Sequence, residues 1–193
     1  MNRINLQIWD SLLFSGLLVF AIWYVLALPD PLFQSPVSLV VEDKDGELLG
    51  ARIAADEQWR FPMSDTIPEK FALAITTFED RRFYNHPGID PIGLARAVKQ
   101  NVENGCIVSG GSTITMQVMR LAYGNAPRTI LQKLKETILA TRLELTYSKA
   151  EILGLYAAHA PFGGNVVGLE AACWRYFGKK PSALSWAEAA TLA

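Results

Sequence analysis

Residues 79–88 carry the side chains best suited to chemistry: two acids, two arginines, a histidine and two aromatic rings, between an apolar run and a Pro-Gly turn. Residues 110–117 and 133–136 form two further polar segments. A carboxylate can exchange a proton with an alcohol, and fixed cations stabilise a departing phosphate. The two separated glutamates, Glu79 and Glu136, and the band of positive charge therefore suit the transfer of a sugar from a phosphate.

Glu79 follows an apolar run that predicts a helix, and it lies just before a loop. Phe78 and Phe83 would shield its carboxylate from water if they packed over it, whereas Arg81 and Arg82 turned inward would favour its ionised form. The sequence leaves both arrangements open, beside the alternative of a glutamate solvated on the surface.

His86 and Gly88 are expected to shape the turn, and proton transfer by His86 is the less favoured alternative. The second histidine is His159, and no Cys/His spacing of the kind that binds zinc is present. No metal site is therefore predicted. Cys106 and Cys173 are too few for a disulfide scaffold and are expected to be unpaired and partly buried.

Residues 110–113, Gly-Gly-Ser-Thr, predict a turn that leads into a helix. The first turn of a helix offers free N–H groups, and Ser112 and Thr113 add hydroxyls, so this segment is suited to an anion. An ordinary flexible turn with an N-cap is the alternative. A P-loop is disfavoured because the Gly-Lys-Ser/Thr ending is absent.

Glu136 is surrounded by cations, namely Arg120, Arg128, Lys133 and Lys135. Lys133 stands three residues before Glu136, so the two would share one face of a helix. The functional interpretation is a cationic cradle for a pyrophosphate leaving group. The alternative is a solvated ion pair that contributes little to stability.

The composition limits the class of protein. With 193 residues, of which 50% are hydrophobic, the chain is long enough for one core. Its formal net charge of -1 argues against general nucleic-acid binding, which needs a strongly basic surface.

Residues 11–28 contain no charged side chain and predict a transmembrane anchor, because a helix of that length spans ~27 Å. Residues 1–10 are expected on the cytoplasmic side, since they contain Arg3. A cleavable signal peptide is disfavoured, because a basic start and a small-residue cleavage site are missing. Residues 29–60 predict a β linker with a hairpin, whose turn contains Asp45-Gly46.

Caps, prolines and apolar periodicity predict helices in the remainder of the chain. They are expected to begin at or near residues 66, 90, 113, 127, 148, 167 and 185. The helix from Pro127 carries an apolar stripe that should face the core. Its members are Ile130, Leu131, Leu134, Ile138 and Leu145.

In this order, the segments resemble the five motifs of the peptidoglycan glycosyltransferase family, the lysozyme-like transglycosylase domain of class A penicillin-binding proteins. The resemblance covers about residues 36–193 and is strongest to the penicillin-binding protein 1C subgroup. The matching residues are Glu79, Asp80, Phe83, His86 and Gly88; residues 110–117; Lys133 and Glu136; Lys149, Glu151 and Tyr156; and residues 176–179 and 187–190.

The resemblance implies an enzyme that polymerises lipid II into β-1,4-linked glycan strands and releases undecaprenyl pyrophosphate. Glu79 would be the general base toward the acceptor hydroxyl, and Glu136 would act on the donor side by holding phosphate-binding cations or a divalent metal. The implied substrate-binding residues are Asp80, Phe83, His86, Gly88, Ser112, Thr113, Gln117, Arg120, Arg128, Lys133 and Lys135.

The same resemblance implies a mainly α, lysozyme-like domain over residues 61–193, on the outer side of the bacterial inner membrane. Its expected partners are lipid II, the nascent glycan strand, the membrane and other cell wall synthesis proteins, without nucleic acid. No tightly bound cofactor is implied, and Mg²⁺ or Mn²⁺ would accompany the substrate pyrophosphate. The family's transpeptidase domain is not expected in this chain.

Two alternatives stay open: a lytic enzyme, because that fold also uses a catalytic Glu, and a non-catalytic relative, which one departure from the family pattern favours. Ala157-Ala158 stands where the family has Leu-Asn, and the missing Asn would leave a neighbouring polar group without a partner. The alternatives are a lytic muramidase or transglycosylase of the same fold, and a non-catalytic relative that binds lipid II.

Overall fold

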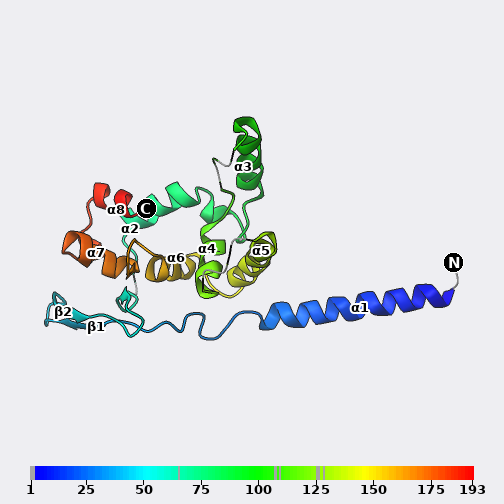
Figure 1. The fold of residues 1–193 in the computed structure, drawn as a ribbon, viewed down its shortest axis with the longest axis horizontal. Coiled ribbons are helices and arrows are strands. Elements are labelled where there is room, and N and C mark those ends of the chain that lie inside the picture. Colours follow the sequence, from blue (N-terminus) through cyan, green and yellow to red (C-terminus); the bar gives the residue numbers. More distant parts are fainter. Residues whose placement is uncertain (1–2, 65, 107, 109, 125–126, 128) are drawn as a thin grey trace. The chain divides into compact units, whose positions relative to one another are not determined.

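The computed structural model describes residues 3–64, 66–106, 108, 110–124, 127 and 129–193, and it divides into two units, Met1–Phe33 and Gln34–Ala193 (Figure 1). The helices are α1 (Arg3–Leu26), α2 (Glu69–Glu79), α3 (Pro91–Asn104), α4 (Ile114–Ala122), α5 (Ile130–Glu144), α6 (Lys149–His159), α7 (Leu169–Phe177) and α8 (Trp186–Leu192). The strands are β1 (Leu39–Glu42), β2 (Leu48–Arg52), β3 (Trp59–Arg60) and β4 (Val166–Val167), and short 3₁₀ helices cover Phe83–Asn85 and Pro181–Ala183. The predicted mainly α class is confirmed.

The first unit contains α1, which ends at Leu26, because the prolines that follow disfavour helical geometry in the residues before them. Within the residues that the structure describes, no helix combines the length and the apolar character that crossing a bilayer requires. The transmembrane anchor predicted over residues 11–28 is therefore not confirmed.

The predicted hairpin is confirmed, with β1 and β2 paired antiparallel and Leu39 opposite Arg52. The carboxylate of Asp43 accepts hydrogen bonds from the backbone N–H groups of Asp45 and Glu47 and so closes the turn. The hairpin belongs to the same compact unit as helices α2 to α8.

A second, very small sheet joins β3 to β4 in parallel, with Trp59 opposite Val166. This pairing contradicts the prediction that a helix begins at Val167. The reason is Gly168, whose φ of 87° keeps the chain out of helical geometry until Leu169.

Most predicted caps are present. Asp90 and Thr113 accept hydrogen bonds from the first turns of α3 and α4, and Ser148 and Ser185 form capping boxes. Two further predicted starts are wrong. The capping box at residues 66–69 does not form, since Pro68 is the N-cap residue of α2, and α5 starts at Ile130 behind Thr129 instead of at Pro127.

The core of the second unit lies around α4, which packs against both α5 and α6 (Figure 1). Its buried side chains include Ile114, Val118 and Met119, and the helices packed against it bury Leu143 of α5 and Ile152 of α6. The start of α4 is therefore held by a closely packed core.

Helix α5 packs with the face opposite to the predicted one. Ile130, Leu131, Leu134 and Leu145 of the apolar stripe are exposed. The buried residues are Glu136, Leu139, Ala140 and Leu143, which also follow the spacing of one helix face. The prediction that the apolar stripe faces the core is wrong because a charged residue, Glu136, finds an ion-pair partner inside the protein.

Gly88 should be essential to packing. Its φ is 88°, and a Cβ atom there would lie 2.7 Å from the carbonyl oxygen of Ala140 in α5. Gly105 has a similar φ of 65° but open space around it. We expect Gly88→Ala to lower the free energy of unfolding by about 1–3 kcal/mol more than Gly105→Ala, measured by denaturant unfolding. Equal losses would mean that the backbone at Gly88 can move away.

Candidate active site

A cavity of 690 Å³, called the main cavity here, lies between α2, α3, α4 and α5. Both predicted catalytic glutamates line it. Its lining residues are Phe78, Glu79, Arg96, Val108, Gly110, Ser112, Gln117, Arg120, Thr129, Ile130, Lys133 and Glu136. The tertiary structure thus brings two acids and three cations from four helices to one space.

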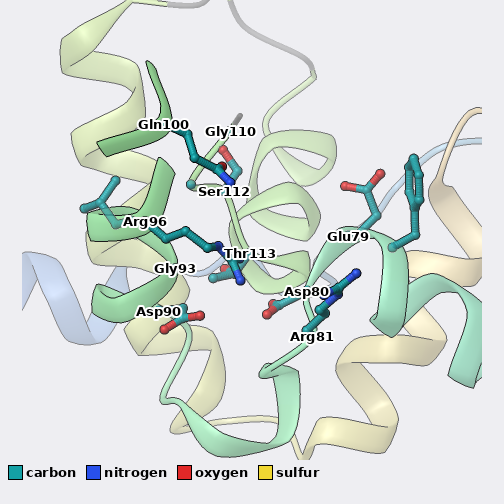
Figure 2. A pocket seen from close by; sticks show the side chains of 13 residues that line it. Glu79, Asp80, Arg81, Asp90, Gly93, Arg96, Gln100, Gly110, Ser112 and Thr113 are labelled. Atoms are coloured by element: carbon teal, nitrogen blue, oxygen red, sulfur yellow. The ribbon is translucent and has the colours of Figure 1, made fainter. Parts of the chain in front are cut away.

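A second cavity of 310 Å³, the side cavity, lies between the end of α2 and α3. Figure 2 shows Glu79 and Asp80 on one side of it and Asp90, Arg96 and Gln100 on the other. The two cavities share Phe78, Glu79, Arg96, Gly110 and Ser112. Glu79 therefore stands where two spaces meet, which suits a group that contacts two substrates.

The carboxylate of Glu79 is held by Gln117. The side-chain amide Nε2 of Gln117 donates a hydrogen bond of 2.7 Å to Oε2 of Glu79. Phe78 does not cover this carboxylate, since its own side chain is exposed. The shield by Phe78 considered from the sequence is therefore absent, and Glu79 is half-buried and open to the cavity.

Asp80 and His86 form a buried pair beneath Glu79. Nε2 of His86 lies 3.0 and 3.1 Å from the two carboxylate oxygens of Asp80. The backbone N–H of Ile114, at the start of α4, donates to Oδ2 of Asp80 at 3.0 Å. Both side chains are engaged inside the protein, and His86 lines neither cavity, so its predicted role in binding substrate is not supported. Asp80 also lines the side cavity, so its predicted contact with substrate stays a prediction.

Phe83 and Gly88 also serve packing. Phe83 is fully buried, and the ammonium of Lys149 lies 4.4 Å from the centre of its ring. The same ammonium donates to the carbonyl oxygen of His86 and to Glu144, both at 2.7 Å. Neither Phe83 nor Gly88 lines either cavity, so the prediction that they bind substrate is not supported.

In the predicted anion-binding turn, Ser112 and Thr113 have different roles. The hydroxyl of Thr113 caps α4 by accepting from the N–H of Met116, and it donates to the carbonyl oxygen of Gly88 at 2.6 Å. Thr113 is therefore occupied, whereas Ser112 lines both cavities and is available to a ligand.

Glu136 pairs with Arg120 rather than with Lys133. Nε and Nη2 of Arg120 donate to the two carboxylate oxygens of Glu136, each at 3.3 Å. The side chain of Glu136 is only 4% exposed, and Arg120 covers it on the cavity side. Such a fork-on-fork pair fixes the position of the guanidinium.

The other predicted cations fall into three groups. Lys133 is exposed on the wall of the main cavity, and in the described part of the chain its ammonium has no ion-pair partner. Lys135 instead lies over the ring of Tyr123, 4.0 Å from the centroid, so its predicted contact with substrate is not supported. Arg128 lies outside the described residues.

Arg96 was not predicted, although it lines both cavities from α3 (Figure 2). Gly111 lies close to α3, because a Cβ atom there would lie 2.7 Å from Cδ1 and 3.2 Å from Cα of Leu94. The glycine thus lets the loop before α4 approach α3 closely. The only sequence signal for Arg96 is a lone arginine on the helix that directly follows residues 79–88.

Tyr156 is close enough to Glu79 to be affected by its charge. Burial, and secondly the negative charge of Glu79, raise the pKa of Tyr156 to about 12, so its hydroxyl keeps its proton at neutral pH. His159 is different: burial, and secondly the charge of Arg60, lower its pKa to about 4. It is neutral at pH 7 and lines neither cavity.

The remaining sequence expectations concern metals, cysteines and Ala157-Ala158. Within the described residues, no three His, Cys, Asp or Glu side chains are grouped to hold a metal ion. Both cysteines are free, Cys106 exposed and Cys173 buried. Ala157 and Ala158 line a small separate cavity, and no described residue lining it has a buried side-chain polar atom without a partner. The expected unpartnered group is therefore not found there.

Residues 45–193 match the protein family described as Transglycosylase. The chain belongs to the transglycosylase family. The match includes every element from β2 to α8, and thus all the helices that form the main cavity.

Named relatives support the family. Penicillin-binding protein 1C of Escherichia coli (strain K12) is 42% identical over 188 residues, which cover 96% of this chain and 24% of that protein. Penicillin-binding protein 1A of Aquifex aeolicus (strain VF5) is 43% identical over 186 residues, 94% of this chain and 25% of the relative. Penicillin-binding protein 1A of Haemophilus influenzae is 38% identical over 161 residues, 83% of this chain and 18% of the relative.

The aligned segments are only a part of these longer relatives. The chain spans about a quarter of the length of the first two relatives. Because a 1C and a 1A relative are almost equally similar to it, the comparison supports the class A penicillin-binding protein transglycosylase domain and does not single out the 1C subgroup.

Removal of one partner of the Arg120–Glu136 pair should destabilise the fold. Arg120→Ala would leave the buried carboxylate of Glu136 without its cation, so we expect the free energy of unfolding to fall by about 2–4 kcal/mol. Lys133→Ala on the same cavity should change it by less than about 0.5 kcal/mol, because Lys133 is exposed. Denaturant unfolding measures both, and a similar small loss in the two variants would contradict a structural role for the pair.

Proposed function

We propose that this domain is a peptidoglycan glycosyltransferase that joins lipid II units into β-1,4-linked glycan. The observation that carries the proposal is that Glu79, Glu136 and three cations line one cavity. A carboxylate in reach of an alcohol and cations in reach of a diphosphate are the two requirements of this transfer.

In the proposed reaction Glu79 is the general base. Gln117 holds one of its carboxylate oxygens, which leaves the other free to accept the proton of the acceptor's 4-hydroxyl. The acceptor oxygen then bonds to the anomeric carbon of the donor, while the bond from that carbon to the pyrophosphate oxygen breaks. An α-linked donor thus becomes a β-1,4 bond, and the acceptor must fit between base and donor, as water does in inverting hydrolases.

The cations of the main cavity would take up the departing diphosphate. Arg96 and Lys133 are exposed on its wall, and Arg120 presents a guanidinium that Glu136 already holds in place. Glu136 in this proposal acts through Arg120 as a positioning residue, which refines its expected donor-side role. Preorganised cations stabilise developing negative charge without reorganisation cost.

The substrate's lipid chain would keep the reaction at a membrane surface, on the outer side of the bacterial inner membrane. A Mg²⁺ or Mn²⁺ ion, where one takes part, would arrive with the pyrophosphate of the substrate. The nascent glycan strand and other cell wall synthesis proteins are the proposed partners. The family match and the class A penicillin-binding protein relatives support this setting.

The central test is Glu79→Gln with labelled lipid II. We expect wild-type protein to form polymer, and the variant to lose at least about 100-fold in rate, because an amide cannot accept the acceptor's proton. Unfolding free energy should stay within about 1 kcal/mol, since Glu79 is half-buried and open to the cavity. Normal polymerisation by the variant would remove Glu79 from the mechanism.

The same assay distinguishes the alternatives. Cleavage of finished glycan by the wild-type protein, without polymer, would support a lytic enzyme. Binding of lipid II without either reaction would support a non-catalytic relative.

Lysines two residues apart on α5 provide a matched test of the cation site. Lys133→Ala should raise KM for lipid II about tenfold, as expected when about 1.4 kcal/mol of binding is lost. Lys135→Ala removes the same charge from the same helix, but its ammonium lies over Tyr123. We expect its KM to be unchanged. Equal effects of the two substitutions would indicate a general charge effect rather than a site.

A further inference from the structure

A separate cavity of 220 Å³, called the hairpin cavity here, lies between the β1–β2 hairpin and α7. Leu48 and Ala51 of β2 form one wall, and Trp174 and Arg175 of α7 form another. None of the described residues that line it also lines the main cavity or the side cavity. What binds in it is therefore independent of the reaction proposed above.

Two further aromatic rings of the hairpin cavity are held in place by the core. Trp59 of β3 and the nearby Phe61 line the cavity and pack against the buried cluster of Val166, Ala171 and Ala172. Strand β3 is in turn paired with β4. The rings are thus fixed before any ligand binds, which lowers the entropy cost of binding.

The hairpin is attached to the domain at both of its ends. At its turn, the ammonium of Lys180 donates to the carbonyl oxygen of Asp45 and pairs with the carboxylate of Glu47, both at 3.0 Å. Before β1, the backbone N–H of Ser38 donates to the carbonyl oxygen of Arg60 at 2.7 Å. The wall that β2 provides is therefore anchored on both sides.

The polar groups of the hairpin cavity are donors without partners. The guanidinium of Arg175 is exposed, and among the described residues it has no ion-pair or hydrogen-bond partner. The indole N–H groups of Trp59 and Trp174 likewise donate to no described residue. Apolar walls with one cation and two further donors suit a ligand that combines an apolar group with a carboxylate.

The volume of the hairpin cavity favours a protein side chain over a small molecule. Pockets for small organic ligands measure ~300–1,000 Å³, so a cavity of 220 Å³ is better suited to one large side chain. The same hairpin leaves Leu39, Val41 and Leu49 exposed by 66%, 51% and 69%. Tryptophan and arginine are also common anchors of protein interfaces. These features together favour a protein partner.

We propose that the hairpin cavity is a docking site for a partner protein that inserts an apolar side chain next to an aspartate or a glutamate. The apolar side chain lies among the rings of Trp59, Phe61 and Trp174, and the acidic side chain pairs with Arg175. The charge selects the partner, since Arg175 repels a basic residue beside the anchor.

Short peptides test the proposal on the whole chain, with isotope-labelled tryptophan. A capped Gly-Phe-Asp-Gly peptide at millimolar concentration should shift the indole N–H resonances of Trp59 and Trp174. The resonance of Trp186 should not move, because this exposed residue does not line the cavity. Capped Gly-Phe-Asn-Gly and Gly-Ala-Asp-Gly lack the charge or the apolar anchor, so they should bind about tenfold more weakly.

Arg175→Glu provides a charge swap with a matched control. The variant should bind Gly-Phe-Asp-Gly about tenfold more weakly, and it should bind Gly-Phe-Lys-Gly more tightly than the wild type does. Since Arg175 is exposed, the variant is expected to fold. Arg52→Glu makes the same change on β2, where the side chain is exposed and does not line the cavity. Both affinities of this control should stay within about twofold of the wild type.

The same titrations define the results that would overturn the proposal. A lack of shifts at Trp59 and Trp174, or an equal shift at Trp186, would mean that the peptides have no specific site here. Equal affinities for the Asp and Asn peptides would remove the role of Arg175. Shifts caused by a chitin oligosaccharide but not by the peptides would indicate a glycan site instead. Shifts caused by raising the protein concentration alone would indicate a second copy of this chain.

Discussion

The start of α4 is the point on which the site depends. A helix begins with N–H groups that need partners, and here the Asp80 carboxylate and the Thr113 hydroxyl provide them. Through the same residues the loop after α2 is tied down, because Thr113 also binds the carbonyl oxygen of Gly88. The cap of α4 and the attachment of the loop that follows Glu79 thus depend on the same residues.

This constraint explains why four of residues 79–88 are buried. Phe83 and His86 are buried, and Gly88 is pressed against α5 so closely that a side chain would not fit. The ammonium of Lys149, from α6, packs over the Phe83 ring. Of the two acids in this segment, Glu79 lines the main cavity, whereas Asp80 is buried beside it.

On the α5 side of the main cavity, an ion pair determines which side chains are buried. Helix α5 buries Glu136 and exposes an apolar stripe, which is unfavourable unless the carboxylate is paired. Arg120 provides that pairing and is itself held at the cavity, beside the exposed Lys133. This domain of the transglycosylase family thereby places the paired guanidinium of Arg120 and the exposed ammonium of Lys133 on the same cavity as Glu79.

Local chemistry was sufficient to predict much of this protein from its sequence. The caps at Asp90, Ser148 and Ser185, the hairpin turn and the helical class depend on residues near one another in the chain, and the ordered motifs indicated the family. The sequence also predicted Glu79 and Glu136 as the two acids of the candidate site, and both line the main cavity. Their environment was decided by contacts between distant segments, which no local pattern encodes. Only the tertiary structure decided that Glu136 pairs with Arg120 and that Arg96 lines the same cavity as Glu79. The physical reason is that ion pairs and close glycine contacts form between residues that are near in space, whatever their separation along the chain.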